Sequence, residues 1–175
     1  MHNSDEPKLV RPKVNKLLGI TTIIIVLNMF ISAFLAWGYH FPPESSICSF
    51  NSTFDCIAGA QSGYGEIFGL SHGIFGLIFY TVLFVGVMGV IFNWPFWKIW
   101  KKLRPGLILD IVRWCSYMGL LFALYLTYVE LTVIYKYCAL CLLQQVLIIV
   151  IVGLLIAVNV IINKGKEETQ VCEFC

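Results

Sequence analysis

Charged side chains are scarce in this chain. Asp, Glu, Lys and Arg make up only 13% of its 175 residues, whereas 59% are hydrophobic. A soluble domain of this size keeps roughly a quarter of its residues charged. The composition therefore excludes an ordinary water-soluble protein. Internal repeats and low-complexity segments are also absent, so we interpret the chain as one domain.

The hydrophobic residues fall into four blocks, each with the roughly 20 apolar residues that a membrane span needs. The blocks cover 17–38, 73–92, 107–135 and 141–162. No small-residue cleavage site follows the first block, which excludes a signal peptide. The third block exceeds one membrane thickness, so we expect tilt or a protruding end. We predict an all-α integral membrane protein, a four-transmembrane-helix bundle with an extracytoplasmic loop and a short helix between spans one and two.

Basic residues are distributed unevenly between the two ends of this bundle. Ten share one end, namely Lys8, Arg11, Lys13, Lys16, Lys98, Lys101, Lys102, Arg104, Lys164 and Lys166, and the other end has only Lys136. Lys and Arg gather on the cytoplasmic side of membrane proteins. We therefore expect cytoplasmic tails at 1–16 and 163–175, a membrane domain at 17–162, and a loop at 39–72 that faces outward.

This topology sorts the seven cysteines, which are Cys48, Cys56, Cys115, Cys138, Cys141, Cys172 and Cys175. Cys48, Cys56, Cys138 and Cys141 share the predicted outer side, and disulfides persist in oxidising compartments. Cys115 lies inside span three and is interpreted as a small packing residue. The terminal C-x-x-C lies on the predicted cytoplasmic side, where we expect it to be reduced and assign it no role.

Cys138 and Cys141 form a second C-x-x-C where span four begins. This spacing is typical of thiol–disulfide exchange, and a helix N-terminus favours the thiolate that attacks in such exchange. The alternative is that Cys138 with Cys141, and Cys48 with Cys56, form structural disulfides. Zinc bound by the four cysteines is disfavoured, because the first pair is spaced C-x7-C and the compartment favours oxidation. We predict redox-active cysteines and no metal site.

Four further polar residues lie close to predicted span ends. His72 either caps span two or belongs to a site. Asp110 and Arg113 are three residues apart, and we expect an ion pair rather than a proton path. Glu130 is interpreted as marking the end of span three, in preference to facing active-site water.

Three stretches together resemble the vitamin K epoxide reductase family. They are Cys48 with Cys56 after span one, Ser-Gly-Tyr-Gly-Glu-Ile-Phe-Gly at 62–69 followed by His-Gly-Ile-Phe-Gly-Leu-Ile-Phe-Tyr at 72–80, and Tyr-Cys-Ala-Leu-Cys at 137–141. The similarity covers roughly residues 17–162 in order. It implies a four-helix bundle that holds a quinone near its outer end.

The resemblance also implies roles for individual residues. Cys141 is the cysteine nearest the quinone, Cys138 exchanges with Cys56, and Cys48 with Cys56 meets a thiol-bearing partner protein. The residues expected to contact the quinone are Ser62, Tyr64, Phe68, His72, Phe75, Phe79 and Tyr80. The quinone is expected to be of the ubiquinone, menaquinone or vitamin K type.

The implied activity is that of a quinone-dependent thiol oxidoreductase that oxidises a thioredoxin-fold partner and supports disulfide bond formation. Some family members carry a fused thioredoxin-like domain, and this chain ends without one, so we expect the partner to act in trans. Membrane lipid and quinone are the other expected partners, and no nucleic acid is expected. The family often has Asn where this chain has His72, and its vertebrate enzymes have Tyr where this chain has Gln145. Both departures argue against specialised epoxide chemistry and leave quinone reduction intact.

Other functions remain as alternatives. Reduction of a quinone or of vitamin K epoxide is one possible main activity. A non-enzymatic four-span protein with a disulfide-stapled outer loop, as in claudin-like or tetraspanin-like proteins, accounts for Cys48 and Cys56 but not for Cys138 and Cys141. An unrelated quinone-linked thiol oxidase of the bacterial disulfide-bond pathway has the same chemistry, but its C-x-x-C lies near the second span.

The predicted topology has a direct test. After mild reduction of intact cells, a membrane-impermeant thiol reagent is expected to label Cys48 or Cys56 and to leave Cys172 and Cys175 unlabelled, because the basic residues orient the tails inward. Mass spectrometry of the labelled peptides measures this. Labelling of the tail from outside would overturn the topology.

Overall fold

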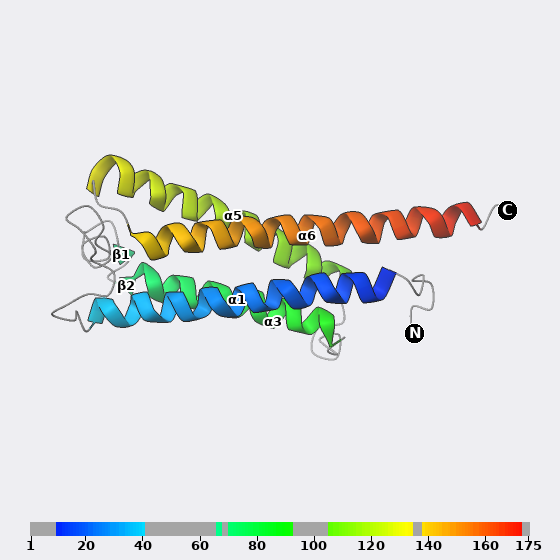
Figure 1. Ribbon diagram of the computed structural model, residues 1–175, viewed down its shortest axis with the longest axis horizontal. Helices are drawn as coiled ribbons and strands as arrows, with labels where there is room; N and C mark the ends of the chain where they lie inside the picture. The colour runs from blue at the N-terminus through cyan, green and yellow to red at the C-terminus, as the bar shows by residue number, and fades with distance from the viewer. Residues whose placement is uncertain (1–9, 41–65, 68–69, 93–104, 135–137, 173–175) are drawn as a thin grey trace.

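Four long helices dominate the structure, a computed structural model that describes residues 10–40, 66–67, 70–92, 105–134 and 138–172 (Figure 1). The helices are α1 (Val10–His40), α3 (His72–Ile91), α5 (Pro105–Val129) and α6 (Ala139–Cys172). Each contains a segment long and apolar enough to cross a membrane: Pro12–Gly38, His72–Ile91, Gly106–Thr132 and Ala139–Gly165. The predicted all-α, four-span membrane bundle is confirmed.

Three short elements complete the described structure, and all lie at one end of the bundle. Strands β1 (Glu66–Ile67) and β2 (Leu70–Ser71) pair antiparallel immediately before α3. The π-helical turn η1 (Glu130–Ile134) continues α5. The short helix expected between spans one and two falls on residues outside the described part of the chain.

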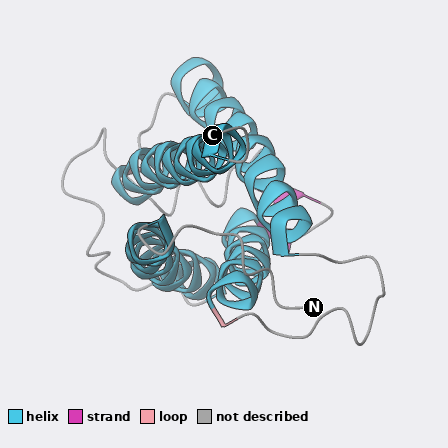
Figure 2. Ribbon diagram, turned by 90° about the vertical axis from the view of Figure 1, so that its right-hand side faces the viewer, coloured by secondary structure: helices cyan, strands magenta, loops and turns pink. Residues whose placement is uncertain are grey.

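The helices form a ring in which α1 packs against α3 and α6, and α5 packs against the same two helices (Figure 2). Figure 1 shows that α1 begins and α6 ends at the same end of the bundle. The starts of α3 and α6 meet the end of α5 at the opposite end. In the same view α5 crosses α6 obliquely, as expected for the longest apolar block.

The helices extend past the predicted span boundaries at both ends of the chain. Helix α1 begins at Val10 and α6 continues to Cys172. Parts of the two segments described above as tails, 1–16 and 163–175, are therefore helical. Ten residues at the end of α6 lie beyond the apolar block at 141–162, so helix length alone does not define the membrane segment.

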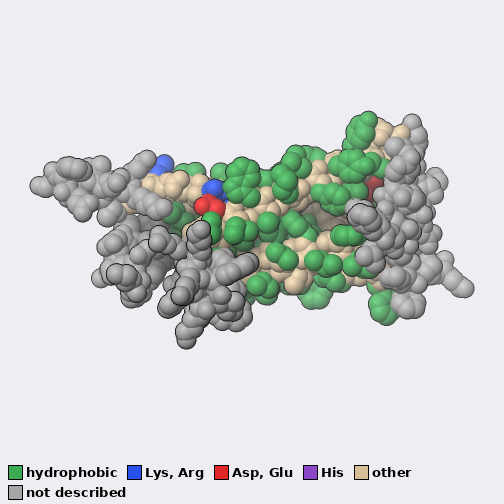
Figure 3. Space-filling model, turned by 180° about the vertical axis from the view of Figure 1, so that it is seen from behind, with side chains coloured by type: hydrophobic (Ala, Val, Ile, Leu, Met, Phe, Trp, Pro, Cys, Tyr) green, Lys and Arg blue, Asp and Glu red, His purple; other side chains and the backbone are tan. Residues whose placement is uncertain are grey.

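Large apolar side chains point outward along the helices, as expected where lipid is the solvent. Ile23 and Phe30 on α1 are each 71% exposed, and Trp114 on α5 is 62% exposed. Figure 3 shows apolar side chains over much of the visible face, with the Lys and Arg side chains toward the end at which α1 begins. Asp110 and Arg113 form the predicted ion pair, with 2.8 Å between carboxylate and guanidinium.

Small residues bring α1 and α3 into close contact. A Cβ atom added at Gly73 would lie 2.7 Å from the backbone nitrogen of Ala36 and 3.0 Å from the carbonyl oxygen of Ser32. At Gly76 it would lie 2.8 Å from the Ser32 hydroxyl. Helices in lipid associate through such close approach of backbones, because no hydrophobic effect drives them together.

A polar contact joins α1 to α6 within the bundle. The amide nitrogen of Gln144 donates to the Asn28 carbonyl at 3.2 Å and to the Ser32 hydroxyl at 2.7 Å. Polar groups without water must find partners inside the protein. This contact therefore fixes the first turns of α6 against α1.

The close approach of α1 and α3 predicts that Gly73→Ala destabilises the bundle. The added methyl group meets backbone atoms that cannot rotate away, and overpacking of this kind costs about 1–3 kcal/mol. Gly153→Ala on α6 is the matched control, since nothing lies within 4 Å of a Cβ atom there. Thermal unfolding in detergent measures both variants. Equal unfolding temperatures would contradict the proposed packing.

Candidate active site

The C-x-x-C begins α6. The carbonyl of Cys138 accepts the first helical hydrogen bond, from the N–H of Leu142 at 3.0 Å, and its sulfur accepts from the N–H of Cys141 at 3.2 Å. Cys138 thus takes the place of an N-cap residue, whose side chain satisfies an unpaired N–H of the first turn. The sulfur of Cys138 lies at the positive end of the helix dipole, which favours a thiolate.

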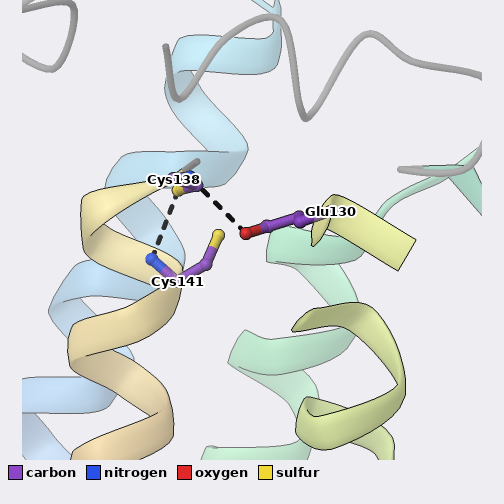
Figure 4. A group of neighbouring side chains, drawn as sticks. All are labelled: Glu130, Cys138 and Cys141. Atoms are coloured by element: carbon purple, nitrogen blue, oxygen red, sulfur yellow. Dashed lines mark hydrogen bonds between the residues drawn. The ribbon is translucent and has the colours of Figure 1, made fainter. Parts of the chain in front are cut away.

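The last described turn of the preceding helix brings a carboxylate to the two cysteines. The N–H of Cys138 donates to the carboxylate of Glu130 at 3.5 Å, and Glu130 is only 8% exposed. Figure 4 shows Glu130 reaching toward both cysteines, with the Cys141 side chain directed at its carboxylate. Both cysteines are free thiols in this structure.

A histidine on α3 approaches the sulfur of Cys141. The hydroxyl of Ser71 accepts from the N–H of Gly73 at 3.2 Å, so Ser71 is the residue that caps α3. His72 is the first residue of the helix, and its Nε2 lies 3.9 Å from the sulfur of Cys141. His72 is therefore part of the cysteine site.

A cavity of about 370 Å³ lies beside these residues, between α3, α5, η1 and α6. Most of its lining is apolar or aromatic: Phe75, Gly76, Phe79, Met118, Gly119, Phe122, Ala123 and Leu126. Its polar or titratable lining residues are His72, Tyr80, Thr127, Glu130, Cys141, Gln144 and Gln145. A mostly apolar cavity with a few placed polar groups is typical of a small-molecule site.

The pKa of Cys138 lies below that of an ordinary thiol. The hydrogen bond from the Cys141 thiol is the largest cause, and the backbone N–H groups of Cys141 and Leu140 act in the same direction. Burial and the negative charge of Glu130 raise the pKa and only partly offset these bonds. Cys138 is therefore predisposed to form the thiolate that thiol–disulfide exchange requires.

Comparison with known protein families shows to which family the chain belongs. Residues 19–157 match the sequence pattern of the vitamin K epoxide reductase family. The chain belongs to this family. No curated protein sequence matches the chain significantly. Membership of the vitamin K epoxide reductase family identifies the protein as an oxidoreductase of the quinone or vitamin K epoxide type.

The structure brings some of the residues predicted for the site together around one cavity. Four of the seven residues expected to contact quinone line the cavity, namely His72, Phe75, Phe79 and Tyr80, together with Cys141. Cys138 is buried and is not among the lining residues. Ser62, Tyr64, Phe68, Cys48 and Cys56 lie outside the described residues, so their roles stay predictions. Cys115 packs against the apolar core, as its sequence context indicates.

The interpretation of Glu130 as only a marker of a span end is wrong. Glu130 lies near the end of the apolar segment Gly106–Thr132, but its side chain is buried and lines the cavity beside the cysteines. The sequence also carries a signal for the cavity residues of the third span. Met118, Phe122 and Leu126 of α5 and then Glu130 of η1 recur every four residues, and side chains four residues apart are neighbours on a helix face.

Cys141 lowers the pKa of Cys138, whereas Glu130 raises it. Substitutions at these two positions are therefore expected to shift the pH dependence of Cys138 alkylation in opposite directions. Cys141→Ala removes the stabilising thiol donor and is expected to raise the pH midpoint of Cys138 alkylation. Glu130→Gln removes a nearby negative charge but keeps a hydrogen-bond acceptor, and is expected to lower that midpoint. Mass spectrometry after brief treatment of the reduced protein with iodoacetamide over a pH series measures both. Asp110→Asn is the control carboxylate, and shifts of the same sign would contradict this assignment.

Proposed function

We propose that this protein is a quinone-dependent thiol oxidoreductase that oxidises a thioredoxin-fold partner and reduces a membrane quinone, and so supports disulfide bond formation. The observation that carries the proposal is the different placement of the two cysteines. Cys141 lines the apolar cavity, whereas Cys138 lies behind it at the start of α6. The sulfur of Cys141 is therefore accessible to a molecule bound in the cavity. The sulfur of Cys138 is available for exchange with a second cysteine pair.

The cavity suits a quinone ring in size and chemistry. Its volume of about 370 Å³ falls within the range of about 300–1,000 Å³ typical of ligand pockets. Phe75, Phe79 and Phe122 supply flat apolar surface. The side chains of His72 and Gln145 are able to donate hydrogen bonds to quinone oxygens. A quinone in this cavity would supply a two-electron, two-proton acceptor beside the sulfur of Cys141.

The cysteine pair accounts for the electrons and protons of the reaction. Cys138 and Cys141 lose two electrons and two thiol protons as their S–S bond forms. The quinone takes up the two electrons and the two protons and becomes the quinol. His72 and Glu130 both face Cys141, so they are positioned to hold a proton during this transfer. An incoming thiolate then attacks Cys138, and Cys141 leaves as the displaced sulfur.

The remaining steps involve residues outside the described part of the chain. We propose that Cys56 of the outer loop exchanges with Cys138, and that Cys48 with Cys56 accepts electrons from the thioredoxin-fold partner. Ser62, Tyr64 and Phe68 are proposed to complete the quinone site. We propose that this end of the bundle faces the extracytoplasmic side and that both termini are cytoplasmic, which the uneven distribution of basic residues supports.

The relay predicts different defects for two cysteine variants. Cys141→Ala is expected to reduce quinone turnover to the uncatalysed level with any thiol donor. Cys48→Ala is expected to retain turnover with a small dithiol, which reaches Cys138 directly, and to lose it with a reduced thioredoxin-fold protein. Anaerobic assay of the purified protein by quinone absorbance measures both, with Cys115→Ala as the control.

Disulfide mapping separates this relay from a structural role for the cysteines. Cys141 is the thiol that resolves a bridge between Cys56 and Cys138, so Cys141→Ala should accumulate that bridge as a crosslinked peptide. A protein with fixed structural disulfides would instead show Cys138 as a free thiol in this variant. That pattern, or equal loss of both activities in the two variants, would end the case for the relay.

A further inference from the structure

We propose that the reduced form of the site binds a zinc-type divalent cation. Its four ligand atoms would be the sulfurs of Cys138 and Cys141, a carboxylate oxygen of Glu130, and Nε2 of His72. Thiolate, imidazole and carboxylate are the ligands that zinc takes in proteins. His72 belongs to α3, Glu130 to η1 and Cys141 to α6, and Cys138 directly precedes α6.

Three of the four ligand atoms already lie close together. One donor atom each from Glu130, Cys138 and Cys141 lies within 4.8 Å of the other two. Nε2 of His72 lies 3.9 Å from the sulfur of Cys141. In a tetrahedral zinc site, bonds of about 2.0–2.3 Å place the ligand atoms roughly 3.3–3.8 Å apart. Binding would draw these three donor atoms closer together and bring the His72 ring, which now approaches only the sulfur of Cys141, toward the other two ligands.

Burial and charge balance favour a cation here. Cys138 is 2% exposed and Glu130 is 8% exposed, so a charge that forms at these groups receives little help from water. Zinc binding releases the two thiol protons and replaces them with one dication. The net charge of the buried cluster is therefore unchanged, while three negatively charged ligands gain a positive partner.

This ligand set differs from the four-cysteine site that the sequence disfavours. It uses only one cysteine pair, and it depends on Glu130, whose place in the site only the structure shows. An S–S bond between Cys138 and Cys141 would occupy both sulfurs. The metal site therefore exists only while the pair is reduced, and a bound metal would keep the pair from transferring electrons. This last consequence rests on the function proposed above, whereas metal binding does not.

Metal content of a defined variant tests the site. In the full chain, Cys48, Cys56, Cys172 and Cys175 are replaced by Ser and Cys115 by Ala, so that Cys138 and Cys141 are the remaining cysteines. The protein is reduced with a phosphine, exposed to Zn²⁺ over a concentration series and separated from free metal. Elemental analysis is expected to give about one zinc per chain, and none after the pair is oxidised. Co²⁺ in place of zinc should show the absorption bands of tetrahedral thiolate coordination.

Single substitutions then identify the ligands. Glu130→Gln, His72→Asn and Cys138→Ser are each expected to weaken binding by more than the roughly 10–100-fold that loss of an outer-shell partner costs. Asp110→Asn, which changes a carboxylate remote from the site, should bind like the parent. Thermal unfolding of each variant without metal checks that it is folded. Absence of zinc from the folded, reduced parent would overturn the proposal, and so would binding that is unaffected by both Glu130→Gln and His72→Asn.

A single-turnover assay separates this proposal from the proposed function. The pre-reduced parent is mixed with quinone with and without one equivalent of Zn²⁺, and zinc is expected to suppress quinone reduction. If the parent retains zinc but never reduces quinone, the proposed function fails while the metal site stands. If it reduces quinone equally fast with zinc bound, metal and electron transfer do not share the sulfurs, and the assigned ligand set is wrong.

Discussion

The hydrocarbon interior of a bilayer offers no hydrogen-bonding partner to a protein, and this constraint shapes the described structure. The backbone N–H and carbonyl groups find their hydrogen-bonding partners within four long helices. Hydroxyl groups within the helices satisfy the constraint locally: Thr21 donates to the carbonyl of Leu17, and Ser116 donates to that of Val112. Longer polar side chains need partners on other helices, so Gln144 ties α6 to α1. The polar contact of Gln144, together with the close approach at Gly73 and Gly76, thus holds α1 beside α6 and α3.

The same constraint explains why the chemistry gathers at one end of the bundle. His72 begins α3, Glu130 follows the last turn of α5, and Cys138 precedes α6. Helix ends leave backbone N–H and carbonyl groups unpaired, and side chains near them supply the missing partners. Ser71 does this for α3, and the sulfur of Cys138 does it for α6. Residues next to these helix ends, His72, Glu130 and Cys141, therefore line the cavity together.

Much of this arrangement follows from the sequence alone. The length of each apolar block predicts the four helices, and the spacing of Cys138 and Cys141 predicts a redox pair at a helix start. Motif similarity points to His72, Phe75, Phe79 and Tyr80, and all four line the cavity. Glu130 was misinterpreted because a lone acid at the end of an apolar block looks the same whether it faces water or a buried cysteine. Only the packing of α5 against α6 separates these cases. The four-residue spacing groups Glu130 with other side chains of one face but does not say what that face contacts.

The π-helical turn η1 begins at Glu130, the residue whose carboxylate approaches the cysteines. A π-turn holds one more residue than the α-helical turn it replaces, and such turns are frequent at functional sites. Each residue of an α-helix rotates the next by about 100°. Deletion of one residue of α5 ahead of Glu130 would therefore turn that carboxylate about 100° away from the cysteines. The length of α5 thus matters to the site as much as the identity of the acid.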